Sequence, residues 1–101
     1  MTNEKDTKQL IEDELENAGI RKRFKGYTFL VEAIYIQISS EEDPESAIGQ
    51  VADKYKQNHE DATKIMQNAI SDACNYFNWP EVMTPSELIQ NFSAKIKQKS
   101  N

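Results

Sequence analysis

Residues that could carry out catalysis are few in this chain. His59 is the only histidine and Cys74 the only cysteine among 101 residues. A metal site or an activated nucleophile needs several such side chains to converge. We expect His59 to cap a helix or lie exposed, and Cys74 to be buried as a small hydrophobe, with a reactive thiol as the alternative. We therefore predict that the protein is not an enzyme and has no metal and no other cofactor.

The other side chains with recognisable chemistry are those that bind nucleic acids. Glutamine and asparagine can pair with adenine, lysine with guanine or phosphate, and threonine with a thymine methyl group or a phosphate. Four such residues lie in one stretch, and they are our candidates for base contacts if that stretch forms a recognition helix: Thr63, Lys64, Gln67 and Asn68. The densest group of cations gives the candidates for phosphate contacts: Arg21, Lys22, Arg23 and Lys25. For both groups the alternative is an ordinary solvated surface.

The overall charge weighs against nucleic-acid binding. The net charge is −5, from 12 basic and 17 acidic residues, whereas contacts to phosphate supply much of the affinity for nucleic acids. A local basic patch can still act on an acidic domain. The length predicts one domain, residues 1–101. No apolar run is long enough to span a membrane and the first residues lack the apolar segment of a secretory signal, so we expect a cytoplasmic protein.

Apolar residues at spacings of three and four predict an all-α protein of about five helices and no strand. The expected helices span residues 6–17, 26–39, 44–56 and 59–77, and a fifth begins at residue 85 and frays over residues 97–101. Three boundaries have clear causes. Gly19 suits a left-handed cap, Asp43 and Pro44 suit an N-cap and first helical position, and the run from Thr84 to Glu87 reads as a capping box.

The helix expected over residues 59–77 has an apolar stripe that ends at Phe77. The next residues, Asn78, Trp79 and Pro80, break the helix. We expect Phe77 and Trp79 to close the core. The alternative is a partly exposed aromatic contact for another protein.

The helices expected over residues 44–56 and 59–77 suit a helix-turn-helix of about residues 44–77. Only a few polar residues join them, and their inner stripes are rich in alanine, which lets two helices cross closely. A plain helical hairpin has the same pattern. In the helix-turn-helix interpretation, residues 59–77 form the recognition helix in the major groove of double-stranded DNA.

The stretch Gly19–Ile34 resembles the start of a known domain. It reads Gly-Ile, a short basic connector and then Lys-Gly-Tyr-Thr-Phe-Leu-Val-Glu-Ala-Ile. This order is similar to the C-terminal DNA-binding effector domain of the master sporulation response regulator (the stage zero sporulation protein A family) of endospore-forming Firmicutes. There a Gly-Val or Gly-Ile pair precedes a basic connector and a Lys-Gly-Tyr-x-x-Leu-x-Glu-Ala-Ile helix.

The resemblance extends over roughly Leu10 to Lys99. Residues 51–55, Val-Ala-Asp-Lys-Tyr, are similar to the family's Ile-Ala-Lys-Lys-Phe, and residues 83–89 resemble its Lys-Pro-Thr-Asn-Ser-Glu-Phe-Ile run. The resemblance implies a compact helical effector domain for transcription regulation, with residues 59–77 as its recognition helix. It also implies weak dimerisation on DNA. The family's phosphorylatable receiver domain has no counterpart in these residues, so we expect a stand-alone relative or a fragment.

The chain departs from the family in the recognition helix itself. The family reads Ser-Arg-Val-Glu-Arg-Ala-Ile-Arg-His-Ala-Ile, and its three arginines fall on Asp61, Lys64 and Gln67 here. Acidic residues at the start of a helix suit the helix dipole but repel a phosphate backbone. An alternative function is therefore open: a protein-interaction module of the same fold that has lost strong DNA binding and binds or sequesters a protein partner.

Overall fold

The computed structural model describes the backbone of residues 4–100 and the side chains of residues 5–98. This part of the chain forms five helices: α1 (Glu4–Asn17), α2 (Lys25–Ser40), α3 (Pro44–Lys54), α4 (His59–Phe77) and α5 (Pro85–Ser100). The predicted all-α domain of about five helices is confirmed. Helix α5 continues to Ser100, and the expected fraying over residues 97–101 stays a prediction; Asn101 lies outside the described residues. No helix in the described part combines the length and apolar character needed to cross a membrane.

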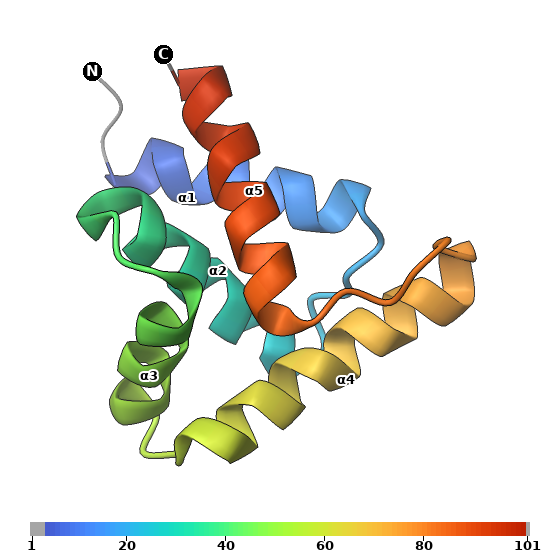
Figure 1. Cartoon of the computed structure of the whole chain (residues 1–101). Helices are drawn as coiled ribbons and strands as arrows, with labels where there is room; N and C mark the ends of the chain where they lie inside the picture. The colour runs from blue at the N-terminus through green and yellow to red at the C-terminus, as the bar shows by residue number, and fades with distance from the viewer. Residues whose placement is uncertain (1–3, 101) are drawn as a thin grey trace.

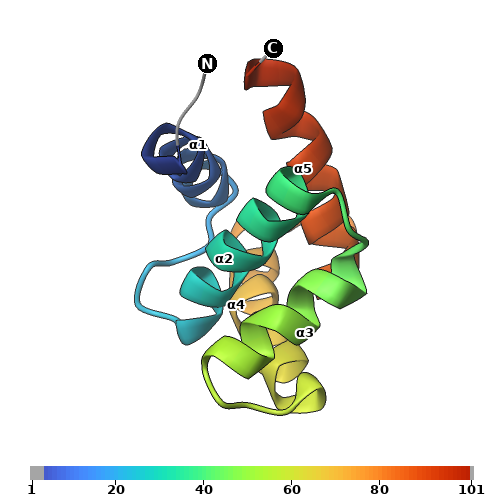
Figure 2. The same ribbon diagram turned by 90° about the vertical axis from the view of Figure 1, so that its left-hand side faces the viewer.

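The second helix, α2, lies at the centre of the fold and contacts each of the other four helices (Figure 1, Figure 2). The other helices also contact one another: α1 packs on α5, α3 packs on α4, and α5 contacts both α3 and α4. A helix with neighbours on several sides needs more than one apolar stripe. Its buried residues are accordingly spread around the helix: Gly26, Tyr27, Phe29, Leu30, Val31, Ala33, Ile34 and Gln37.

Helix α2 approaches α4 closely at Gly26. A Cβ atom built on this glycine would lie 2.4 Å from the carbonyl oxygen of Ile65 and 2.8 Å from the Cβ of Ala69. Both distances are far below an ordinary van der Waals contact, so the two helices can cross this closely only because residue 26 lacks a side chain. The crossing brings the connector before α2 alongside α4.

The caps predicted from the sequence are confirmed. Gly19 adopts a φ of 93°, in the left-handed region, just after α1. The Asp43 side chain accepts a hydrogen bond from the backbone N–H of Ser46 at 2.8 Å. At the start of α5, the N–H of Glu87 donates to Thr84 Oγ1 at 3.2 Å and the N–H of Thr84 donates to Glu87 Oε1 at 3.1 Å. Each cap satisfies backbone groups that a helix end leaves unpaired.

A carboxylate on α2 joins three helices. Glu32 lies 3.3 Å from Lys8 Nζ of α1 and 2.5 Å from Lys54 Nζ of α3. Burial alone would raise the pKa of Glu32, but the hydrogen bonds from Lys54 and Lys8 outweigh it and hold this pKa below its ordinary value of 4.5. The same hydrogen bond raises the pKa of Lys54. The charged form of Glu32 therefore stabilises the packing of α1, α2 and α3.

The predicted burial of Phe77 is wrong. Its side chain is 53% exposed, and the neighbouring Tyr76 is 66% exposed. The last turn of α4 extends past α5 (Figure 1), so the apolar stripe continues beyond the helices that cover it. Phe77 instead lies over Gly19, where a Cβ atom would be 2.1 Å from its ring. Trp79 is partly buried and packs against the core, so it closes the core only in part.

Candidate nucleic-acid interface

Helix α4 has a buried face and an exposed face, as its spacing of apolar residues predicts. The residues on the buried face are Ala62, Met66, Ala69, Ile70, Ala73 and Cys74. The predicted burial of Cys74 is thereby confirmed. The exposed side carries mainly polar and charged residues: Glu60, Asp61, Lys64, Asn68 and Asn75. These exposed side chains are available to a partner that approaches α4 from solvent.

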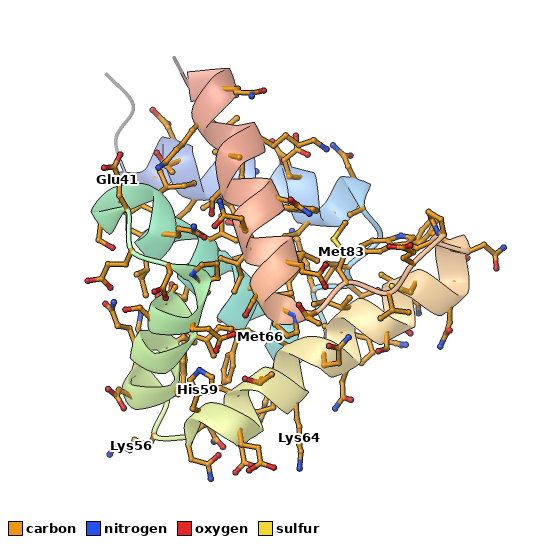
Figure 3. All side chains as sticks on the ribbon, viewed as in Figure 1. Glu41, Lys56, His59, Lys64, Met66 and Met83 are labelled. Atoms are coloured by element: carbon orange, nitrogen blue, oxygen red, sulfur yellow. The ribbon has the colours of Figure 1, made fainter. Side chains whose placement is uncertain are left out.

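Two of the predicted base-contact residues lie on this exposed face. Lys64 and Asn68 are four positions apart, so they are neighbours on the helix surface. Lys64 points away from the body of the protein (Figure 3). Its Nζ lies 3.5 Å from Glu60 Oε1, but both side chains are mostly exposed. An exposed ion pair of this kind contributes little, so Lys64 can leave it for another anion at small cost.

The other two predicted base-contact residues are engaged within the protein. Thr63 Oγ1 donates a hydrogen bond to the carbonyl oxygen of His59 at 2.8 Å. Gln67 Nε2 donates to the carbonyl oxygen of Met83 at 3.2 Å and lies 3.5 Å from Ser71 Oγ. This amide nitrogen has two N–H groups, and a bidentate contact with adenine would use one of them, so it would compete with the contacts to Met83 and Ser71. The four candidates therefore do not form one free surface.

Arg21, the first of the predicted phosphate-contact residues, is held against α4. Its Nε lies 3.1 Å from Asp72 Oδ2, and its guanidinium carbon lies 4.7 Å from the centre of the Tyr76 ring. Asp72 Oδ2 is buried and has no hydrogen-bond partner, so the nearby charge of Arg21 compensates for its burial. Arg21 thus stabilises the position of the connector rather than extending into solvent.

The other three cations of the connector remain exposed beside α4. We call Lys22, Arg23 and Lys25 the basic edge. Lys22 Nζ lies 3.6 Å from Glu16 Oε1, and the guanidinium carbon of Arg23 lies 5.5 Å from the centre of the Phe24 ring. Lys25 begins α2 and is exposed. Such exposed cations can contact phosphates without breaking the fold.

Tyr27 ties the connector to α1. Its hydroxyl donates to Glu16 Oε2 at 3.4 Å. Burial, followed by the negative charge of Glu16, raises the pKa of Tyr27, so the hydroxyl stays protonated and remains a donor. Together with Gly26, this explains physically why the Lys-Gly-Tyr sequence occurs at the start of α2: glycine permits the close approach to α4, and tyrosine anchors the preceding helix.

One further cluster of reactive residue types is present, and sequence reasoning missed it. Glu45 accepts a hydrogen bond from Ser86 Oγ, and its other carboxylate oxygen lies 3.0 Å from His59 Nε2. In a nucleophilic triad the histidine stands between the serine and the carboxylate, whereas here the carboxylate stands between the other two. The cluster therefore joins the first turns of α3, α4 and α5. Within the described residues, no group of three or more histidine, cysteine or acidic side chains could hold a metal ion.

We found no match to this chain among protein-family models, curated proteins or solved structures. The resemblance to the sporulation regulator's effector domain therefore rests on the residues quoted above.

Proposed function

We propose that this domain binds double-stranded DNA as an effector of transcription regulation, with α3 and α4 as a helix-turn-helix and α4 in the major groove. The observation that carries the proposal is the placement of Lys64 and Asn68 one turn apart on the exposed face of α4, with the basic edge on the adjoining connector. Lysine can contact guanine or phosphate, and asparagine can pair with adenine.

The connection between α3 and α4 supports the proposal. Only residues 55–58 separate the two helices, and Lys56 has a φ of 58°. The turn of a helix-turn-helix has three or four residues and often contains glycine, the residue that adopts such a φ most readily. Here a lysine takes that conformation, and its side chain lies exposed (Figure 3).

The proposal divides the candidate residues by role. Lys64 and Asn68 read bases, while hydrogen bonds from the Thr63 hydroxyl or the Gln67 amide to DNA would compete with those to His59 and Met83. Lys22, Arg23 and Lys25 hold phosphates, and Arg21 mainly positions the connector. Weak pairing of two copies on adjacent sites fits the same arrangement and is part of the proposal.

A charge reversal on α4 tests the proposal. Asp61 is exposed in the first turn of α4, where it would repel phosphate. Replacing it by arginine changes the local charge by two units, which is worth about 1–2 kcal/mol near a phosphate and hence about five- to thirtyfold in affinity. We expect Asp61→Arg to strengthen binding to a random-sequence duplex at about 50 mM salt, measured by fluorescence anisotropy.

The matched control for this test is Glu41→Arg. Glu41 is exposed just after α2, at the end of that helix opposite to Lys25, and it lies far from Lys64 (Figure 3), so the same change of net charge occurs away from the proposed interface. If Glu41→Arg strengthens binding as much as Asp61→Arg, the gain comes from net charge alone and α4 does not face DNA.

The acidic start of α4 favours a second candidate function. Glu60 and Asp61 are both exposed there, and the chain has a net charge of −5. A protein-interaction module that uses this face would bind a basic protein partner, or would sequester a DNA-binding regulator. Loss of binding to such a partner in Asp61→Arg, with no gain on DNA, would favour this function over the first.

A further inference from the structure

An exposed apolar patch lies at the C-terminal end of α4, away from Lys64. Tyr76, Phe77 and Val82 are 66%, 53% and 58% exposed, and they are the large hydrophobic residues exposed in the described part of the chain. They fall within seven positions, at the end of α4 and in the connection to α5. A cluster of this kind, rather than scattered single residues, marks a surface that binds something.

A hollow of about 880 Å³ adjoins this patch. Its walls come from the end of α1, the end of α4, the α4–α5 connection and α5, and the large apolar side chains that line it are Phe77, Trp79, Val82, Met83 and Phe92. We call it the connection hollow. Met83 lies in the space between α1, α4 and α5 (Figure 3). A second, smaller hollow of about 430 Å³, lined by Gly19, Arg21 and Tyr76 among others, lies on the other side of Phe77.

The apolar wall between the two hollows is fixed by packing. The Phe77 ring lies so close to the backbone of Gly19 that a Cβ atom there would be 2.1 Å away. The ring also makes an edge-on contact with Tyr76, with 4.8 Å between ring centres. Because the wall exists before any partner arrives, little conformational entropy is lost when a partner binds.

The charges on the rim indicate which partner fits. Glu81 is exposed on the rim, and Glu87 accepts only a backbone hydrogen bond, from Thr84. The one cation on the rim, Lys95, lies 3.6 Å from a carboxylate oxygen of Glu14, so its charge is offset. The rim is therefore negative, which repels nucleic acids and anionic membranes.

The same charges argue against pairing of two copies through this surface. A symmetric dimer places the same patch on both subunits, so Glu81 and Glu87 of one copy would approach the same acidic residues of the other. Like charges brought together at an interface are costly. A partner with cations around an apolar anchor is complementary instead.

We propose that the connection hollow binds a short segment of a protein partner that carries one or two large apolar side chains flanked by lysine or arginine. The apolar side chains enter between Trp79, Met83 and Phe92, and the flanking cations pair with Glu81 and Glu87. This surface lies at the opposite end of α4 from Lys64, and the inference does not depend on DNA binding.

Selection from random peptides tests the inference without assuming a partner. A library of random peptides of about 12 residues is selected on the wild-type protein after depletion on the Val82→Lys variant. Val82 is 58% exposed, so a lysine there adds one positive charge to the negative rim and leaves the core intact. Enriched peptides are then titrated, and the fluorescence of Trp79 reports binding because it is the only tryptophan in the chain.

The expected result is enrichment of peptides with large apolar residues and net positive charge, which shift the emission of Trp79 saturably. Val82→Lys should weaken their binding at least tenfold, whereas Ser39→Lys, the same charge change at an exposed position at the far end of α2, should change it less than twofold. Enrichment of neutral or acidic peptides, or equal effects of the two variants, would overturn the proposal. A wild-type dimer that Val82→Lys converts to monomer would also overturn it, because the occupant would then be a second copy.

Discussion

The substitution Gly26→Ala tests the helix crossing on which the candidate interface depends. The added Cβ atom would lie 2.4 Å from the carbonyl oxygen of Ile65, about 1 Å short of the 3.4 Å at which ordinary contacts begin. That oxygen belongs to the backbone of α4, so it cannot rotate away as a side chain could. Either α2 or α4 must shift as a whole.

The size of the effect follows from two opposing contributions. Overpacking of a close contact costs about 1–3 kcal/mol, and alanine recovers up to about 1 kcal/mol through its better helix propensity. We expect a net loss of about 2 kcal/mol from an unfolding free energy of about 5–15 kcal/mol for a domain of this size. At about 4–8 °C for each kcal/mol, the midpoint of thermal unfolding should fall by about 10 °C.

Thermal and urea unfolding followed by circular dichroism at about 222 nm measure this loss. Gly49→Ala is the matched control, because Gly49 lies inside α3 and its Cβ atom would be 3.9 Å from the nearest atom, His59 Cδ2. That variant should be more stable than the wild type by about 0.5–1 kcal/mol. If Gly26→Ala is stabilised to the same extent, α2 and α4 do not approach each other as described.

Three other predictions concern local strain and charge. Lys56→Gly should raise the unfolding free energy by about 1 kcal/mol, because residue 56 has a φ of 58°. Asn78→Gly should raise this free energy less, although residue 78 has a φ of 52°, because asparagine tolerates this region. Equal increases for the two variants in urea unfolding would contradict this cause. Because the pKa of Glu32 is lowered, its charge stabilises the fold above its ordinary pKa of 4.5, and this contribution is lost as the pH falls through the lowered pKa. Glu32→Gln should therefore be less stable than the wild type near pH 7. A difference in unfolding free energy between the two proteins that stays constant down to about pH 3 would refute the reasoning. Arg21→Gln should lower the unfolding free energy by about 1 kcal/mol through loss of its ion pair with α4. Arg23→Gln should instead weaken DNA binding with little change in stability. Loss of stability in Arg23→Gln and loss of DNA binding alone in Arg21→Gln would contradict the roles assigned to the two arginines.

The helices and their ends could be predicted because their causes are local. Asp43 and the Thr84–Glu87 box act within one turn of the helix that they cap, and the spacing of apolar residues reports the buried face of each helix. The left-handed conformation of Gly19 could be predicted for the same reason, because it depends on the residue's own backbone and its position after a helix.

The candidate interface could be predicted only in part, because its side chains are engaged by residues distant in sequence. The hydrogen bond from Gln67 to Met83 spans 16 residues, and the one from Ser86 to Glu45 spans 41. No pattern within one helix indicates such partners. The exposure of Phe77 was missed for a related reason: the stripe on α4 is periodic to its last turn, but the sequence does not say how far along α4 the neighbouring helices pack against it.

Selection from a pool of random DNA duplexes tests the central claim most directly. The purified protein is mixed with the pool at about 50 mM salt and again at about 200 mM, and the retained duplexes are sequenced. DNA binding through α4 and the basic edge predicts an enriched sequence and a steep loss of retention at the higher salt, because each phosphate contact releases counterions. No retention of any duplex even at about 50 mM would contradict DNA binding and leave the protein-interaction module as the function to test.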